Sequence, residues 1–205
     1  MSNSAAPQTG RQGRLIVLSG PSGSGKTTLI REALASGDLH IRLAISATTR
    51  PPRHNEVDGK HYHFWTSDRF LDAIHADKFI EHAKVYGHHY GTLHEEVDKY
   101  LSQGMNVLLE LDIQGGLQIR EKMKDSVLVF LRASTPEEYE RRLRARKTDS
   151  QASLEKRLES ALKEIEIGSS QYDYQIINDN LDQAVHEFRQ LILNISQAGQ
   201  PQLKP

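Results

Sequence analysis

The residues best suited to chemistry are a glycine-rich run that ends in a lysine and a hydroxyl residue. The run is Gly20-Pro21-Ser22-Gly23-Ser24-Gly25-Lys26-Thr27, which fits G-x-x-x-x-G-K-[ST] and follows the apolar stretch 15–18. This pattern is that of a P-loop. In such a loop, backbone N–H groups converge on phosphate oxygens, the lysine meets the β and γ phosphates, and the hydroxyl binds Mg²⁺. A flexible Gly/Ser turn is the alternative. The strand and helix patterns on either side favour a nucleoside triphosphate site.

Two arginines in a proline-containing loop form a second group that suits phosphate. The loop is Thr48-Thr49-Arg50-Pro51-Pro52-Arg53, and its prolines restrict the backbone, so the arginines are presented at a set separation. Guanidinium groups bind phosphate oxygens in planar, bidentate pairs. Because arginines beside prolines also occur in ordinary surface turns, this loop is weak evidence on its own.

Acidic residues follow an apolar strand pattern farther along the chain. Glu110 and Asp112 come after the stretch 107–109, as in a Walker B element, which places a carboxylate near the Mg²⁺ of a P-loop. Either acid is a candidate for binding the ion through water. The competing interpretation is a turn at the end of the strand, since Ile113-Gln114-Gly115-Gly116 follows directly.

A basic segment could supply further cations. Arg142 and Arg146 are four residues apart on a helix that opens with a capping box at 135–138, so they share a face, and Arg157 belongs to a second helix. Alone, this run could be a nucleic-acid patch or a solvated basic face, and the solvated face is favoured. Beside a P-loop, phosphoryl transfer needs cations that close over the transferring group, which favours a lid at 134–169.

The elements that position these residues alternate between strands and helices. Alternating apolar residues at 41–45 predict a strand that ends at Ser46, and helical spacing follows the P-loop as far as Gly37. Further strands are predicted at 126–131 and 174–177, with an amphipathic helix at 182–195. We therefore predict an α/β fold, with a parallel sheet of P-loop type and helices on both faces.

Residues 62–104 predict a small inserted unit. Its patterns are a strand at 62–65, a helix at 68–76, and strands at 79–86 and 88–92 around Gly87. Several histidines fall in or beside this unit and raise the alternative of a metal site: His61, His63, His88, His89 and His94. No carboxylate completes a recognised ligand spacing, so we expect no such site.

Composition limits the remaining classes. The chain has 205 residues, a net charge of -1 and no cysteine, which excludes a disulfide framework, a Cys-ligated zinc site and a Cys nucleophile. The charge also argues against general binding to nucleic acid or to anionic membranes. Residues 1–13 lack the apolar core of an export signal, and no apolar run approaches the length of a membrane span. We expect a cytoplasmic protein with mobile tails at 1–13 and 196–205.

The stretch 49–64 resembles the signature of the guanylate kinases, which has Thr, Arg, a basic residue, an acid, Gly, Tyr and an aromatic residue at fixed spacing. Trp65 departs from that pattern, because the family carries an aliphatic residue or Lys there; the departure concerns local packing more than chemistry. The resemblance extends from about Arg14 to about Ile195, nearly the whole chain.

The resemblance implies a role for each matching position. Four residues would hold the phosphate of GMP: Arg50, Arg53, Tyr62 and Tyr90. Three would recognise guanine, with Asp112 nearby: Ser46, Glu81 and Thr92. Asn178 would lie near the adenine of ATP. The catalytic group would comprise Lys26, Arg50 and the lid arginines Arg142, Arg146 and Arg157.

The resemblance also implies the organisation and the partners. It implies a domain at 14–195 whose core is 14–45, 105–133 and 170–195, with a GMP-binding subdomain at 46–104 and the lid at 134–169. ATP and GMP would be the substrates and Mg²⁺ the cofactor, in purine nucleotide metabolism. We expect no nucleic-acid or membrane partner, and the sequence leaves a homo-oligomer open.

Two other functions remain at this stage. Guanylate kinase-like modules of scaffold proteins bind peptides without catalysis, but their P-loops are typically damaged, whereas Lys26 and Thr27 are intact here. A ribose bisphosphate phosphokinase would share the P-loop half but would not need Glu81. Nucleotide binding and acceptor choice separate these alternatives.

Overall fold

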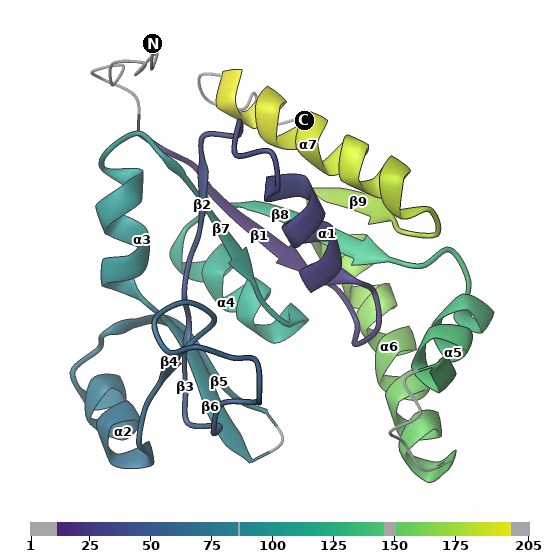
Figure 1. The fold of residues 1–205 in the computed structure, drawn as a ribbon, viewed down its shortest axis with the longest axis horizontal. Coiled ribbons are helices and arrows are strands. Elements are labelled where there is room, and N and C mark those ends of the chain that lie inside the picture. Colours follow the sequence, from purple (N-terminus) through teal and green to yellow (C-terminus); the bar gives the residue numbers. More distant parts are fainter. Residues whose placement is uncertain (1–11, 86, 146–150, 198–205) are drawn as a thin grey trace. The chain divides into compact units, whose positions relative to one another are not determined.

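A computed structural model describes residues 12–85, 87–145 and 151–197 of the chain. Five strands form the larger sheet, in the order β2-β7-β1-β8-β9 (Figure 1). They are β2 (Ile41–Leu43), β7 (Asn106–Glu110), β1 (Leu15–Ser19), β8 (Val127–Arg132) and β9 (Tyr174–Ile177). The pairs β2 with β7, β1 with β8 and β8 with β9 are parallel, which confirms the predicted α/β fold of P-loop type.

Within the described residues, the chain divides into two compact units. The first takes the residues up to Leu15 together with Ile41–Leu109 and Leu117–Ser126, and the second takes Ile16–His40, Glu110–Gly116 and the residues from Val127 onward. Neither unit is continuous in sequence. Contacts within each unit therefore join segments that lie far apart along the chain.

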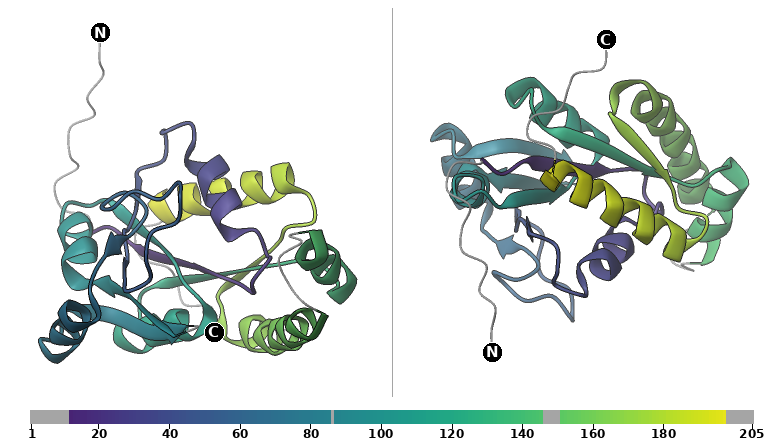
Figure 2. Two further views of the ribbon diagram at one scale, coloured as in Figure 1. Left: turned by 60° about the horizontal axis from the view of Figure 1, so that its bottom comes forward. Right: turned by 90° about the horizontal axis from the view of Figure 1, so that it is seen from above.

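The second unit has helices on both faces of its strands. Figures 1 and 2 show α1 (Lys26–Leu34) and α7 (Leu181–Gln197) side by side on one face, and α6 (Gln151–Gln171) on the other, with α5 (Pro136–Ala145) packed along it. Burial on both faces explains why β1 is apolar apart from Ser19, and buried throughout. Gly168 lets α6 approach β8 closely, because a Cβ there would lie 2.4 Å from the Phe130 ring.

The first unit contains the smaller sheet, in the order β4-β3-β6-β5. Its strands are β4 (His63–Phe64), β3 (Ala47–Thr48), β6 (His88–Leu93) and β5 (Phe79–Val85), and its helices include α2 (Ser67–His75) and α3 (His94–Leu101). The patterns predicted α2 and three of these strands, although β4 is shorter than expected. They did not predict α3, which buries Val97 and Leu101.

An aromatic core joins α2 to this sheet. Phe70 stacks on Phe79 with ring centroids 4.4 Å apart, and Ala47 and Ala73 complete the buried cluster. Trp65 packs against the cluster, 6.3 Å from the Phe70 ring and 6.0 Å from the Phe79 ring. The departure from the family signature at this position is therefore accommodated as an additional core aromatic residue.

Helix α4 (Ile113–Lys122) begins where a turn was an alternative, and that alternative is wrong. Asp112 Oδ1 accepts the N–H of Gly115 at 2.8 Å, which is an N-cap contact to the third residue of the helix. Gly116 allows close packing, because a Cβ there would lie 2.1 Å from the Tyr172 hydroxyl. The cap and this packing offset the low helix propensity of the two glycines. None of the described helices is long and apolar enough to cross a bilayer.

We predict that the Asp112 carboxylate stabilises the start of α4. Asp112→Ala should lower the free energy of unfolding by about 0.5–2 kcal/mol, because Gly115 loses its acceptor. Asp112→Asn keeps an acceptor oxygen and should cost much less. Urea unfolding of the two variants measures the difference, and equal losses would show that the cap is not what Asp112 contributes.

Candidate active site

The P-loop lies between β1 and α1 in the second unit, as the sequence predicts. Gly23 and Gly25 have φ angles of 92° and 93°, a left-handed region that favours glycine. Gly25 is the N-cap of α1 and makes no side-chain cap hydrogen bond. The first N–H groups of this helix thus form the kind of N-terminus that binds anions.

Lys26 lies over this loop. Its ammonium donates to the carbonyl of Gly20 at 2.6 Å and lies 3.4 Å from that of Pro21. The buried Ser24 hydroxyl, also in the loop, has no hydrogen-bond partner among the described residues. A lysine held against the loop backbone is placed to contact a phosphate bound by the same loop.

The two oxygen-bearing side chains of a P-loop metal site lie together. Thr27 donates its hydroxyl to Glu110 Oε1 at 2.7 Å, although the residues are 83 positions apart. Oxygen donors of this kind suit Mg²⁺, which usually keeps several waters and takes few protein ligands. Among the described residues, no group of three or more His, Cys, Asp or Glu side chains could hold a metal ion. The residues at Thr27 and Glu110 therefore fit Mg²⁺ bound jointly by protein, phosphate and water.

Asn178 links the end of β9 to the P-loop. Its buried side chain donates from Nδ2 to the Ser24 carbonyl at 2.8 Å. The approach is close enough to require glycine next door, because a Cβ on Gly25 would lie 2.5 Å from the same Nδ2. Asn178 thus supports the loop directly.

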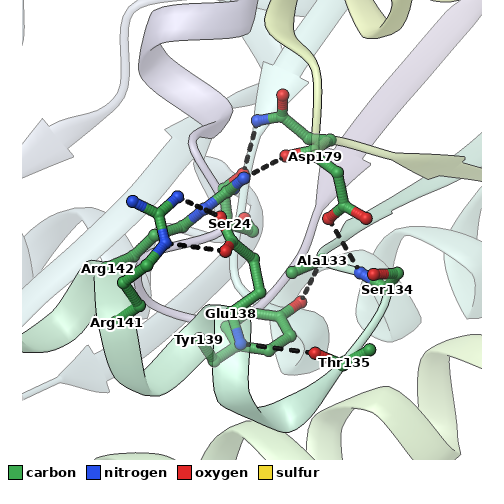
Figure 3. A network of polar contacts seen from close by, with 10 residues as sticks. Ser24, Ala133, Ser134, Thr135, Glu138, Tyr139, Arg141, Arg142 and Asp179 are labelled. Carbon is green, nitrogen blue, oxygen red and sulfur yellow. Dashed lines mark hydrogen bonds and ion pairs between the residues drawn. The ribbon is translucent and has the colours of Figure 1, made fainter.

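Arg142 belongs to the same network, shown in Figure 3. Its Nε donates to Glu138 at 2.6 Å, and Nη2 donates to the backbone carbonyl of Asn178. Hydrogen bonds from Arg141 and Arg142 lower the pKa of Glu138 to about 2, so this carboxylate is charged at neutral pH. Arg142 is therefore held in one orientation beside a residue that contacts the P-loop.

The helix that carries Arg142 has its own anchor. Tyr139 is fully buried, and its hydroxyl accepts the N–H of Ala133 at 2.9 Å (Figure 3). Burial raises the pKa of this phenol to about 12. Of the other predicted lid arginines, Arg157 is partly exposed on α6, and Arg146 lies outside the described residues.

In the first unit, the three residues expected to recognise guanine are joined by hydrogen bonds. Thr92 donates to Glu81 Oε1 at 2.8 Å, and the Ser46 and Thr92 hydroxyls lie 3.0 Å apart. Glu81 and Thr92 are opposite each other in the pairing of β5 with β6. Glu81 is only 3% exposed, so its carboxylate lies in a desolvated setting where a hydrogen bond to a charged group is strong.

Tyr90, one of the residues expected to hold phosphate, lies two positions before Thr92 on the same strand. Arg50 donates from Nε to the Tyr90 hydroxyl at 3.3 Å, and its guanidinium is 5.6 Å from the centre of the Tyr62 ring. Tyr90 and Thr92 share one face of β6, because side chains in a strand alternate with period two. Arg53 lies in the neighbouring loop with an exposed side chain.

Asp112, which was also predicted near the guanine, is the one residue of this prediction that belongs to the other unit. It belongs to the second unit, is exposed, and caps α4. Because Glu110 contacts Thr27 whereas Asp112 caps a helix, Glu110 is the better candidate for the metal-side carboxylate.

Three acids were given no role in the sequence analysis. Glu56 pairs with Arg50, Glu138 pairs with Arg142, and Glu164 on α6 has a pKa raised by burial and modulated by the charges of Lys26 and Asp112. Glu56 was visible as the acid of the signature and Glu138 as the acid of the capping box. The sequence did not show which arginine each of these two acids contacts, since this depends on the positions of the side chains in the folded chain.

Comparisons with known proteins identify the family of the chain. The family model described as guanylate kinase matches residues 12–195. A guanylate kinase from Clostridium perfringens is 46% identical over 182 residues, which cover 89% of this chain and 83% of that protein. A guanylate kinase from Fusobacterium nucleatum is 45% identical over 182 residues, which cover 89% of this chain and 97% of that protein.

The structural comparison gives the same answer. The crystal structure of guanylate kinase from Anaplasma phagocytophilum matches with a TM-score of 0.73 at 28% identity, covering 93% of this chain and 89% of that one. A family-model match over nearly the whole length, relatives at 45–46% identity and a shared fold all point to one conclusion: the chain belongs to the guanylate kinase family.

Proposed function

We propose that this protein transfers the γ-phosphoryl group of ATP to GMP, giving ADP and GDP, with Mg²⁺. The observation that carries the proposal is the polar face of the smaller sheet. There, Thr92 and Tyr90 share one face of β6. Thr92 lies within hydrogen-bond distance of Ser46 and Glu81, and Tyr90 accepts a hydrogen bond from Arg50. One ligand that has a donor-bearing base and a phosphate matches both groups. The proposed setting is purine nucleotide metabolism in the cytoplasm.

Glu81 is proposed to select guanine. Guanine presents two adjacent donors, N1–H and the 2-amino group, which a carboxylate accepts together, whereas adenine presents an acceptor at N1 and no amino group beside it. The Thr92 hydroxyl orients the carboxylate by donating to Oε1. A site built to accept hydrogen bonds rejects an analogue that lacks the donors, by about 10⁴–10⁵ in kcat/KM.

The second unit is proposed to bind ATP and to stabilise the transferring group. P-loop residues 20–27 would hold the phosphates, Lys26 would neutralise the β and γ phosphates, and Asn178 would lie near adenine. Thr27 and Glu110, the latter through water, would hold Mg²⁺, which when bound neutralises developing charge on the phosphate oxygens. Arg142 and Arg157, with Arg146, would add cations that stabilise this charge.

No general base is required in this scheme. The acceptor is a phosphate monoester with a second pKa near 6, so it is already a dianion at neutral pH. The residues therefore contribute position and charge: Arg50, Arg53, Tyr62 and Tyr90 orient the acceptor, and Lys26 and the lid arginines stabilise the transition state.

The reaction is tested by coupled ADP release with ATP and Mg²⁺ against GMP, AMP, CMP and UMP. We expect GMP to be the preferred acceptor by orders of magnitude. Absence of both ATP binding and turnover would indicate a non-catalytic module. Turnover with ribose 1,5-bisphosphate but not with GMP would indicate a ribose bisphosphate phosphokinase. Either result would overturn the proposal.

Glu81→Gln tests the choice of base. The amide keeps the size of the side chain, but it adds a donor and removes the charge, so kcat/KM for GMP should fall sharply and the ratio of GMP to AMP should narrow. Steady-state kinetics with both acceptors measure that ratio. If the ratio is unchanged, Glu81 does not recognise guanine.

Arg142→Ala tests the cation beside the P-loop. Loss of a preorganised cation should lower kcat by on the order of 10²–10³ while leaving GMP affinity nearly unchanged. Arg144→Ala is the matched control, because Arg144 is on the same helix and pairs with Glu140 at the surface. Equal effects of the two substitutions, or a loss of GMP affinity with unchanged kcat, would remove Arg142 from the catalytic group.

A further inference from the structure

The acid that faces Arg50 has three hydrogen bonds to the phosphate-binding loop. Glu56 Oε2 and Oε1 accept Nη1 and Nη2 of Arg50, each at 2.8 Å, and Oε2 also accepts the backbone N–H of Arg53 at 2.8 Å. The paired side chains are only 13% and 16% exposed. One carboxylate thus fixes the side chain of one arginine and the backbone of the other.

The distribution of donors on the guanidinium shows which edge Glu56 leaves unoccupied. Glu56 takes the end of the group, where Nη1 and Nη2 each direct one N–H outward. Nη1 also donates to the Pro51 carbonyl at 2.7 Å, and Nε donates to the Tyr90 hydroxyl. The edge formed by Nε and Nη2 therefore lies beside Tyr90, on a different side of the group from the Glu56 carboxylate.

The surroundings keep this arrangement in place. The guanidinium lies 5.6 Å from the Tyr62 ring centre and 5.8 Å from that of Phe64, so aromatic surface flanks it. The hydrogen bond to Arg50 lowers the pKa of Glu56 to about 2, and the pKa of Arg50 is raised in return. The carboxylate, whose pKa is depressed, loses its charge only as the pH falls through about 2, so the ion pair persists throughout the pH range of an enzyme assay.

We propose that Glu56 is a positioning residue for the acceptor phosphate. Its carboxylate holds Arg50 by the guanidinium end, so that the Nε and Nη2 edge and the Tyr90 hydroxyl receive the phosphate of the acceptor nucleotide together. Glu56 stays paired when the ligand binds, because carboxylate and phosphate use different edges. This inference rests on the proposed function, since it concerns the phosphate of GMP.

Competition between Glu56 and the phosphate for the same edge of Arg50 would change GMP affinity in the opposite direction. If Glu56 competed with phosphate for the same edge, removing its charge would strengthen GMP binding. If Glu56 positions Arg50, removing its carboxylate weakens GMP binding. Glu56→Gln places an amide donor against a guanidinium donor, so the Arg50 guanidinium no longer keeps its orientation. The direction of the change in affinity therefore decides between positioning and competition.

The experiment compares GMP with guanosine, which keeps the base and lacks the phosphate. Titration calorimetry of Glu56→Gln should show a weaker Kd for GMP, by about 10- to 100-fold, the cost of removing an outer-shell partner of a binding group at metal sites. The Kd for guanosine should stay unchanged. In kinetics, KM for GMP should rise while KM for ATP stays the same, with the same change at pH 6 and pH 8.

Glu95→Gln is the matched control, because Glu95 is an exposed acid on α3 in the same unit. It should leave both affinities unchanged. If Glu56→Gln does not fold, Glu56→Asp replaces it, since a shorter side chain keeps the charge but cannot reach both Nη atoms equally. It should also raise the ratio of the Kd for GMP to the Kd for guanosine.

Each remaining outcome has one meaning. Unchanged or tighter GMP binding overturns the positioning role, and equal weakening of GMP and guanosine overturns it in favour of a general structural role. If the wild-type protein does not phosphorylate GMP, the proposed function itself fails. If the wild type is active and the ratio of the Kd for GMP to the Kd for guanosine is unchanged in Glu56→Gln, only the role of Glu56 is refuted.

Discussion

The charge of phosphate is the constraint on which the rest of this structure depends. A nucleotide brings several negative charges, and flexible cations in water would lose much entropy in ordering around them. In both units an arginine is instead fixed in advance by a glutamate: Arg50 by Glu56 and Arg142 by Glu138. Each glutamate holds a guanidinium in one orientation, and the guanidinium itself stays protonated. Preorganised charge of this kind is what phosphoryl transfer requires.

The two faces of the smaller sheet differ: one forms a packed core, and the other carries the residues proposed for recognition of GMP. On one face, Phe70 and Phe79 stack and Ala47 is buried beneath α2, with Trp65 at the margin. The alternate residues of the same strands, which include Tyr90 and Thr92, carry the polar groups. Because alternation is built into a strand, a packed core on one side holds the recognition residues on the other side in register.

The P-loop is held from outside as well as by its own glycines. Asn178 donates to Ser24 from 154 residues away and occupies the space that a side chain on Gly25 would need. The same residue accepts a hydrogen bond from Arg142 through its backbone. A single position at the end of β9 thus connects the phosphate loop to an arginine of α5, and each of these contacts lies within the second unit.

The sequence alone determined the P-loop, the α/β class and most of the strands, because glycine spacing and the periods of apolar residues are local properties. Through the signature at 49–64, it also indicated three of the residues proposed to hold the GMP phosphate: Arg50, Arg53 and Tyr62. Only the tertiary structure decided that residues 113–116 are helical, since this depends on the Asp112 cap and on packing against Tyr172. It also decided which acid faces which arginine. Four acids of the same residue type have different partners, because strand register and chain reversal place each of them differently. They are Glu56 with Arg50, Glu81 with Thr92, Glu110 with Thr27 and Glu138 with Arg142.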